Sequence, residues 1–584
     1  MAERTDRIIK IGGEAGEGVL SCGELLSLAL ANAGYEIFTL QVIPAEIKGG
    51  ACNFLVRADA SPVRSHGEAL DLLVCFNEEA FALLKAGLKP GGLLIYDPAR
   101  FVPAGDGFIP YPLPFEHLAV HEVKSAIAKN VVALGALGCL LGLPYETLEK
   151  FIRGRKKWIK KGQAVIDKNV YALRVGYDAV RDNPPPLDLT MAPPRPTGVE
   201  RIVAPGNDMV TMGAIAAGLK FYAGYPITPA STILEKLEEW LPKFGGYAIQ
   251  TEDEIAAVSA IVGASFTGAK AMTATSGPGL ALMTEVIGLA MMTETPIVIV
   301  NVMRGGPSTG LPTKTEQSDL NLAVYGGHGD APRIVVAASD VEDCFTTAVD
   351  AFTLAEKYQM PVILLSDYSL ATRTQTIPRP NFDAVKPPQR AVPTAEEIAA
   401  GYKRFKLTES GISPMAVPGT PGGQFTATGL EHNETGAPHM TGAMHKSMTE
   451  KRYRKVAGAA QERGYTRRFG SPQAKVGIVC WGTTTGPVSE AVDRALAKGY
   501  PVAALQVRMV CPIPNEVRGF IESMETILVP ELNWTGQFAN MLRARFLKPV
   551  VQLNKIEGLP FTAGEIYVKI AELFDVPVGT RSAS

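Results

Sequence analysis

The sequence predicts an α/β protein with three doubly wound domains. Short apolar runs typical of buried strands alternate with longer runs of helical periodicity, a pattern that favours parallel sheets covered by helices. A proline-rich stretch and a long irregular stretch separate these runs into three groups. The chain has 584 residues, and at roughly 100–200 residues per domain this length accommodates three or four domains.

The first domain is expected at residues 1–185, followed by a linker at residues 186–198. Its strand-like runs lie at residues 8–12, 37–43, 72–76 and 93–96, with a glycine-rich turn and a helix at 20–33 after the first run. The repeated prolines of the linker prevent a continuous helix or strand there.

The second domain is expected at residues 199–377, where strands again alternate with helices. The strands are predicted at residues 221–225, 271–274, 297–302, 334–337 and 362–366, with helices after Glu254 and at 341–357. Residues 378–470 are rich in Gly, Pro, Thr, His and Met and are predicted to be irregular. An irregular segment of this length is typically functional or in contact with a partner.

The third domain is expected at residues 471–584 and has the length to fold by itself. Its strands are predicted at residues 476–481, 502–507, 527–529 and 550–553, with a helix at 488–497 between the first two.

The composition indicates which kinds of partner and metal site the chain is not expected to have. A formal net charge of -2 gives no reason to expect nucleic acid or an anionic membrane as a partner. No apolar run approaches the roughly 18 residues needed to span a bilayer, and the first residues show no signal-peptide core, so we expect a cytoplasmic protein. The seven cysteines form no CxxC pair, so we expect this chain to hold no iron–sulfur cluster, and we expect no zinc site among its seven histidines.

The glycine-rich turn GGEAGEG at residues 12–18 follows a strand and begins a helix. Backbone N–H groups in this setting bind phosphates, which makes Gly13, Gly16 and Gly18 candidate contacts. The acid that would bind a ribose is poorly placed, because Glu36 starts the next strand instead of ending it. An anion site other than a dinucleotide site and a purely structural turn therefore both stay open. Downstream, Glu46 and Lys48 lie in a loop that either binds a ligand or is a charged turn.

The motif GYPITPAS at residues 224–231 places Thr228 in a turn between a strand and a helix. Pro226 and Pro229 flank it, and proline lowers the entropic cost of presenting a hydroxyl in one direction. In the alternative interpretation, Pro229 and Ser231 only start the helix.

Glu254 occupies an unusual position in the helix that it begins. At about 100° per residue it shares one side with Val258 and Ile261, so it lies within the apolar stripe. A carboxylate there is costly unless it has a partner, and it suits a hydrogen bond to a ring nitrogen. The alternative is an ordinary acid at a helix N-terminus.

Two further motifs follow predicted strands. TSGPG at residues 275–279 is a turn poor in side chains that a ligand or another subunit could approach. The loop at residues 301–320 carries Arg304 and Lys314, which could bind a carboxylate; a solvated surface loop is the alternative. Gly105-Asp106-Gly107 with Asn130 superficially suggests a magnesium–diphosphate motif, but no apolar strand precedes it and Val131 stands where a second Asn is required.

Together these motifs, in this order, resemble the α-subunit of 2-oxoacid:ferredoxin oxidoreductases. The turn at residues 12–18 and the loop at 44–53 resemble the γ module of that family, fused ahead of α. The resemblance covers nearly the whole chain and implies a γ-like domain, a thiamine-diphosphate pyrimidine-binding domain and a transketolase C-terminal-like domain.

The resemblance also implies a shared active site. Thiamine diphosphate would lie between this chain and a β-subunit that carries Mg²⁺ and a 4Fe–4S cluster, in an assembly of the (αβ)2 type. Glu254 would bond to the aminopyrimidine ring, with Pro226 beside the cofactor. Thr228 would face the 2-oxoacid and Lys314 would neutralise its carboxylate, although the family often has Arg at or near this position. Arg304 would be a second anion contact or a brace for its loop.

The implied reaction is oxidative decarboxylation of a 2-oxoacid to an acyl-CoA, with electrons passed to ferredoxin, and it can run in reverse. Coenzyme A would contact the γ-like domain at Gly13, Gly16 and Gly18. The fused γ–α arrangement most resembles the 2-oxoglutarate enzymes, which form succinyl-CoA and CO₂; pyruvate and branched 2-oxoacids are alternatives. A hypothesis of another class is a non-catalytic scaffold that binds CoA or a nucleotide.

Overall fold

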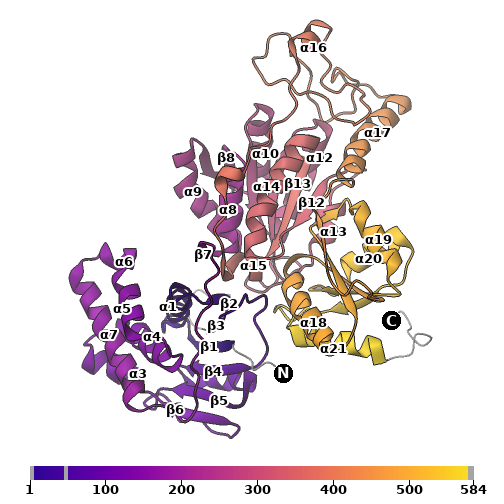
Figure 1. Cartoon of the computed structure of the whole chain (residues 1–584). Coiled ribbons are helices and arrows are strands. Elements are labelled where there is room, and N and C mark those ends of the chain that lie inside the picture. The colour runs from indigo at the N-terminus through magenta and orange to yellow at the C-terminus, as the bar shows by residue number, and fades with distance from the viewer. Residues whose placement is uncertain (1–5, 45–49, 576–584) are drawn as a thin grey trace. The chain divides into compact units, whose positions relative to one another are not determined.

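The computed structural model describes residues 6–44 and 50–575. The chain divides into two compact units, Met1–Ala204 with Arg373–Arg379, and Pro205–Thr372 with Pro380–Ser584. Figure 1 labels the elements of both. Glu46 and Lys48 lie outside the described residues. Within the described ranges, no helix is both long and apolar enough to cross a bilayer.

The N-terminal unit contains a mixed sheet of eight strands in the order β6-β5-β4-β1-β3-β2-β14-β7. Strands β1, β4, β5 and β6 pair in parallel, whereas β3 is antiparallel to both β1 and β2. The sequence did not predict β3, which pairs along both of its edges. The strands are β1 Arg7–Glu14, β2 Glu36–Val42, β3 Ala51–Asp59, β4 Leu70–Cys75, β5 Leu88–Tyr96, β6 Phe108–Pro112, β7 Arg201–Pro205 and β14 Thr374–Pro378.

Three helices form the main layer against this sheet: α1 Val19–Asn32, α4 Lys129–Leu140 and α7 Gln163–Asp182. Helices α4 and α7 pack closely because both carry glycine at the contact. A Cβ on Gly135 would lie 2.1 Å from the carbonyl oxygen of Leu173, and one on Gly176 would lie 1.9 Å from that of Val132. The same unit contains the shorter helices α2 Glu78–Leu84, α3 Phe115–His117, α5 Tyr145–Arg153 and α6 Lys156–Ile159.

The proline-rich residues 186–198 form neither helix nor strand, as the sequence predicts. They nevertheless pack on the N-terminal unit. Leu189 and Met191 are buried in its core, and the N–H of Met191 donates to the carbonyl of Leu141 at 3.1 Å.

The second unit begins with a sheet of seven strands in the order β18-β12-β13-β11-β10-β8-β9. All neighbours pair in parallel except β18, which is antiparallel to β12. The strands are β8 Phe221–Gly224, β9 Tyr247–Gln250, β10 Ala271–Thr275, β11 Ile297–Met303, β12 Ile334–Ala337, β13 Pro361–Asp367 and β18 Met509–Cys511. The helices around it are α8 Gly206–Ala216, α9 Ser231–Trp240, α10 Glu254–Phe266, α11 Gly277–Leu282, α12 Thr284–Met292, α13 Leu320–Tyr325, α14 Val341–Tyr358 and α15 Tyr368–Thr372. The predicted parallel α/β fold is confirmed here.

The C-terminal residues add a sheet of five strands in the order β15-β17-β16-β19-β20, parallel except for β15. Its strands are β15 Thr466–Gly470, β16 Val476–Cys480, β17 Val502–Val507, β19 Thr526–Glu531 and β20 Val551–Asn554. Its helices are α18 Thr485–Ala497, α19 Asn515–Ser523, α20 Gln537–Phe546 and α21 Ala563–Asp575.

The segment at 378–470 contains one long helix that the sequence did not predict, α17 Gly442–Ala459, in addition to the short α16 Ala395–Ala399. Helix α17 lacks an apolar stripe because it buries charged residues instead. The ammonium groups of Lys451 and Lys455 both bond to the carboxylate of Glu294, and all three side chains are fully buried. Burial lowers the pKa of Lys455 to about 7, and the nearby Glu294 opposes that shift.

Candidate active site

The predicted site residues follow strands that end at one edge of the seven-stranded sheet. Thr228 follows β8, Glu254 follows β9, the TSGPG turn follows β10, and Arg304 and Lys314 follow β11. Because these strands are parallel, their carboxyl ends meet at the same edge, where open α/β sheets bind ligands. Figure 1 shows this sheet with α10 and α12 packed beside it.

Glu254 is the first residue of α10 and is 5% exposed. The preceding Asp253 caps the helix by accepting a hydrogen bond from the N–H of Ala256 at 2.7 Å, so Glu254 is not used as the cap. Val258 and Ile261 are buried on the same side of the helix, which confirms the predicted stripe.

The TSGPG turn makes room for two acids of this chain. A Cβ on Gly279 would lie 2.6 Å from Oε1 of Glu254, and a Cβ on Gly277 would lie 2.8 Å from both carboxylate oxygens of Asp319. The absence of side chains at these positions therefore lets both carboxylates approach the backbone of the turn.

Arg304 is 6% exposed and connects two of the loops. Its Nη1 donates to the backbone carbonyl of Thr228 at 2.6 Å. Burial lowers the pKa of Arg304, and the charge of nearby Asp319 opposes this. Asp319 in turn accepts a hydrogen bond from Nδ2 of Asn301 at 3.0 Å, and burial raises its pKa. The structure thus supports Arg304 as a brace for the Thr228 turn.

Lys314 lies at the end of a loop that closes on itself. The N–H of Gly305 donates to the carbonyl of Lys314 at 3.1 Å, and the N–H of Leu311 donates to that of Gly305 at 2.8 Å. Lys314 is half-buried, and burial lowers its pKa. Within residues 6–44 and 50–575, no carboxylate forms an ion pair with its ammonium group, so this charge is available to a ligand.

Buried polar atoms at this sheet edge lack partners. Oγ of Ser276, Oδ1 of Asn301 and Nε of Arg304 have no hydrogen-bond partner in the described part of the chain. Buried polar atoms are rarely left unpaired in proteins, so this lining fits a polar ligand.

The glycine-rich turn lies in the N-terminal unit and differs from a simple phosphate loop. Gly16 and Gly18 adopt φ values of 102° and 92°, which favour glycine. Gly18 is the N-cap residue of α1 and provides no side-chain cap for the first N–H groups of that helix. The carboxylate of Glu17, however, accepts from the N–H of Glu14 at 2.9 Å and lies against Gly13, which leaves less room for an anion at that end of the turn.

Sequence profiles of one enzyme family match most of the chain. They describe pyruvate flavodoxin/ferredoxin oxidoreductase, thiamine-diphosphate-binding, at residues 212–451; pyruvate ferredoxin/flavodoxin oxidoreductase at 8–179; and pyruvate:ferredoxin oxidoreductase core domain II at 474–564. The alpha subunit of 2-oxoacid:ferredoxin oxidoreductase 2 from Aeropyrum pernix is 32% identical over 623 residues, which cover 95% of this chain and 96% of that one. This chain belongs to the 2-oxoacid:ferredoxin oxidoreductase family.

Other relatives agree with this membership. The 2-oxoglutarate oxidoreductase subunit KorA of Mycobacterium tuberculosis is 33% identical, with 96% of this chain and 90% of that one covered. The solved 2-oxoglutarate:ferredoxin oxidoreductase from Magnetococcus marinus, with 2-oxoglutarate, coenzyme A and succinyl-CoA bound, is 43% identical with a TM-score of 0.93, covering 98% of this chain and 100% of that one. The family resemblance drawn from the motifs is confirmed. The chain is an α-subunit of a heteromeric thiamine-diphosphate oxidoreductase, and Thr228, Glu254, Arg304 and Lys314 all lie within its thiamine-diphosphate-binding domain.

Two polar residues next to the candidate site residues were not predicted from the sequence. The loop at residues 301–320 was predicted to carry binding residues, but Asp319 and Asn301 in that range were not among the residues named. Asp319 could have been predicted from its position, because it is an acid that ends a long polar loop and directly precedes α13.

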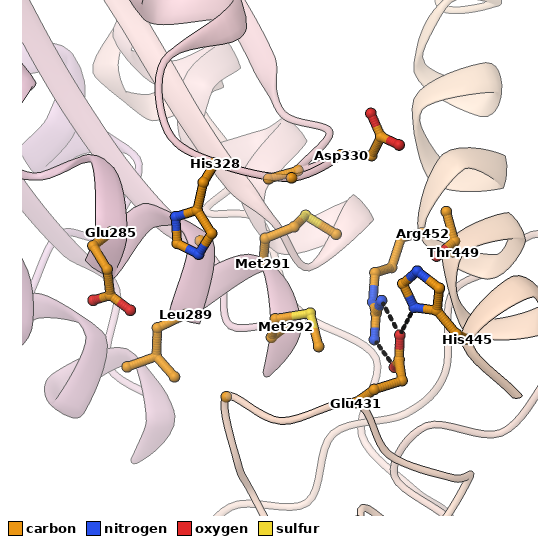
Figure 2. Close-up of a pocket in the computed structure, with 14 residues that line it drawn as sticks. Glu285, Leu289, Met291, Met292, His328, Asp330, Glu431, His445, Thr449 and Arg452 are labelled. Atoms are coloured by element: carbon orange, nitrogen blue, oxygen red, sulfur yellow. Dashed lines mark hydrogen bonds and ion pairs between the residues drawn. The ribbon is translucent and has the colours of Figure 1, made fainter. Parts of the chain in front are cut away.

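A cavity of about 400 Å³ lies away from the candidate site residues (Figure 2). Its residues Leu289, Met292 and His328 precede the amino ends of β11 and β12, whereas the site residues follow carboxyl ends. Three of its polar side chains bond to one another, because Glu431 accepts from Arg452 at 2.7 Å and from His445 at 2.6 Å. These bonds join the segment around Glu431 to α17, as the dashed lines in Figure 2 show.

Proposed function

We propose that this α-subunit oxidises 2-oxoglutarate to succinyl-CoA and CO₂ and passes the electrons to ferredoxin through a β-subunit, in a reaction that can reverse with a strong reductant. The observation that carries the proposal is the carboxylate of Glu254, which is buried beside the side-chain-free turn at Gly279 on the ligand-binding edge of the sheet. Thiamine diphosphate, when bound, supplies the carbon nucleophile and the electron sink for decarboxylation.

Glu254 is proposed to hold the aminopyrimidine ring through a hydrogen bond to a ring nitrogen. A carboxylate buried among apolar side chains is poorly solvated, so a ring N–H would replace the lost hydration. This bond favours the imino tautomer of the ring, the form that can remove a proton. Pro226 and Thr228 are exposed at the same edge, where the cofactor ring and the 2-oxoacid would lie.

Lys314 is proposed to neutralise a carboxylate of the 2-oxoacid. Its half-buried ammonium has no carboxylate partner among the described residues, so little solvation is lost when a substrate carboxylate binds. Arg304 is proposed to act through Thr228, whose carbonyl it holds, and so to orient the hydroxyl that faces the substrate.

A β-subunit is proposed to complete the site, with Mg²⁺, the diphosphate motif and a 4Fe–4S cluster, in an (αβ)2 assembly. Four apolar side chains close to the site residues in the sequence are strongly exposed: Tyr225 at 41%, Ile249 at 42%, Ile255 at 45% and Leu282 at 51%. Exposed apolar residues gathered near one site are typical of a protein interface. All seven cysteines are free thiols, which supports a reducing, cytoplasmic compartment.

Coenzyme A is proposed to bind the N-terminal unit beside Gly16 and Gly18. A cavity of about 390 Å³ is lined by Asn130, Trp158 and Lys161, among others. Asn130 is also the nearest residue to a Cβ placed on Gly18. The residues RGRKKWIKK at 153–161 carry six basic side chains around Trp158. This combination suits a ligand with several phosphates and an aromatic base. Gly13 is the weaker contact, because Glu17 lies against it.

The choice of 2-oxoglutarate is supported by relatives named for it, including the KorA subunit and the Magnetococcus marinus enzyme. The test is kcat/KM of the assembled enzyme for 2-oxoglutarate, 2-oxobutyrate, pyruvate and 3-methyl-2-oxobutanoate with coenzyme A and ferredoxin. A preference for 2-oxoglutarate of at least about 100-fold, or about 2.7 kcal/mol, is expected. A preference for pyruvate or the branched acid would assign the subunit to those enzymes, and no turnover of any 2-oxoacid would favour the non-catalytic scaffold.

A further inference from the structure

The loop that carries Lys314 is held by the C-terminal sheet domain of the same unit. The N–H of Thr315 donates to the carbonyl of Gly558 at 3.2 Å, and the N–H of Gln317 donates to the carbonyl of Leu532 at 2.7 Å. These partners come more than 200 positions later in the chain. The loop has few apolar side chains to fix its own shape, so these contacts define where Lys314 lies.

Gln317 bonds to the C-terminal sheet domain through both its backbone and its side chain. It is fully buried, its Nε2 donates to the carbonyl of Trp481 at 3.0 Å, and its Oε1 accepts from the N–H of Leu532 at 3.1 Å. Its own carbonyl accepts from Nδ2 of Asn533 at 3.1 Å. A buried amide with all these partners permits one loop position, because any shift leaves polar groups unpaired.

Gly558 touches the side chain of Lys314 itself. A Cβ on Gly558 would lie 2.8 Å from Cβ of Lys314 and 3.0 Å from its Cγ and Cδ, so the lysine methylenes lie on the glycine backbone. The loop of Gly558 is itself held, because Nζ of Lys555 donates to the carbonyl of Pro560 at 3.2 Å and to Glu565 at 2.7 Å. Any side chain at residue 558 would therefore displace the lysine more readily than the loop.

We infer that the C-terminal domain positions the substrate lysine: Gly558 sets the direction of the Lys314 side chain and Gln317 fixes the backbone three residues beyond it. Both would be positioning residues, because each acts through Lys314. The domain thereby sets the affinity for the 2-oxoacid from outside the pocket. This inference rests on the proposed role of Lys314.

The test is the Gly558→Ala variant in the complete complex with its β-subunit. The KM for 2-oxoglutarate is expected to rise about tenfold, the kinetic equivalent of about 1.4 kcal/mol, while kcat changes less than about twofold. The matched control is Gly499→Ala. Gly499 belongs to the same domain and has φ +85, close to the +72 of Gly558, but a Cβ on Gly499 would have no neighbouring atom within 4 Å. Equal effects of the two variants, or an unchanged KM in Gly558→Ala, would overturn the inference.

A second comparison separates positioning from general damage. In a Lys314→Ala background, Gly558→Ala is expected to leave the KM where Lys314→Ala alone puts it, because no ammonium remains to be misplaced. A further rise in that background overturns the inference. If Lys314→Ala alone leaves the KM unchanged, the proposed role of Lys314 fails instead.

Gln317→Leu provides a variant that does not depend on glycine strain. It removes the bonds to Trp481 and Leu532 at similar volume, and the same rise in KM, absent in the Lys314→Ala background, is expected. If Gly558→Ala does not assemble, this variant decides the matter by the same criterion.

Discussion

Nη1 of Arg304 donates a hydrogen bond of 2.6 Å to the backbone carbonyl of Thr228. The bond joins the loop after β11 to the turn after β8, so the two loops that would surround the 2-oxoacid are mechanically linked. The sequence left two roles open for Arg304, an anion contact and a brace, and this contact favours the brace. Kinetics can separate the two, because a lost anion contact raises KM whereas a lost brace lowers kcat.

Replacing Arg304 with alanine is expected to lower kcat about tenfold, because a single hydrogen bond contributes up to about 1.5 kcal/mol. Arg304→Lys, which can keep one donor, should lose less. Steady-state kinetics of the assembled enzyme measures both. A large rise in KM with kcat intact would instead identify Arg304 as an anion contact.

Glu254→Gln should lower kcat by at least about 100-fold, the usual scale for a group that assists proton transfer. The side chain keeps its volume, so assembly with the β-subunit should be unchanged, which size-exclusion chromatography checks. Asp253→Asn provides the control, since it alters only the neighbouring cap. Near-normal turnover of Glu254→Gln would remove Glu254 from the mechanism.

Lys314→Ala is expected to raise the KM for the 2-oxoacid about 10- to 100-fold, as a lost charge-assisted hydrogen bond of about 1.5–3 kcal/mol requires. The pH dependence follows from burial. Burial lowers the pKa of Lys314, so its charge is lost at a lower pH than in a free lysine, and KM should rise as the pH increases through that lowered pKa. Lys314→Arg should abolish that rise. A KM in the wild type that stays flat with alkaline pH would contradict the role.

Lys161→Ala combined with Lys168→Ala should raise the KM for coenzyme A about tenfold, with the KM for the 2-oxoacid unchanged. Both lysines line the cavity next to Asn130, and exposed charges are worth up to about 1 kcal/mol each. Lys150→Ala serves as the control, because Lys150 belongs to the same unit but does not line the cavity. Equal effects of the control and the double variant would argue against this coenzyme A site.

Glu294→Gln should lower the free energy of unfolding by about 3–5 kcal/mol, because two buried ammonium groups lose their counter-charge. Glu434→Gln, which breaks the more exposed pair with Lys403, should cost less than about 1 kcal/mol. Thermal and denaturant unfolding of the assembled enzyme compare the two. Equal losses would show that the buried cluster does not hold α17.

The residues that the sequence could identify were those with a local pattern. Glu254 stood out because an acid interrupts a helical stripe, and the structure places it on the buried side of α10. The parallel strands of the second unit were predictable from short apolar runs. Helix α17 was not, because Lys451 and Lys455 are buried only by virtue of Glu294, which lies 157 and 161 positions earlier.

Gly558 and Gln317 could not be predicted from the sequence either, because their contacts also join distant parts of the chain. Nothing near Gly558 in the sequence indicates that Lys314 lies on it, since the contact depends on how two domains pack. The contacts of Asp319 were likewise not predictable, because they involve Gly277 in α11 and Asn301 in β11, 18 positions earlier in the chain. Local patterns therefore revealed the family motifs, whereas long-range packing determines the residues that position them.

The most direct test of the account is the 2-oxoglutarate- and coenzyme-A-dependent reduction of ferredoxin, measured with this α-subunit alone and with its co-purified β-subunit, in the presence of thiamine diphosphate and Mg²⁺. Rapid reduction by the complex is expected, with none by the α-subunit alone and none by a complex that carries Glu254→Gln. Equal reduction by the Glu254→Gln complex, or none by the wild-type complex with any 2-oxoacid, would contradict it.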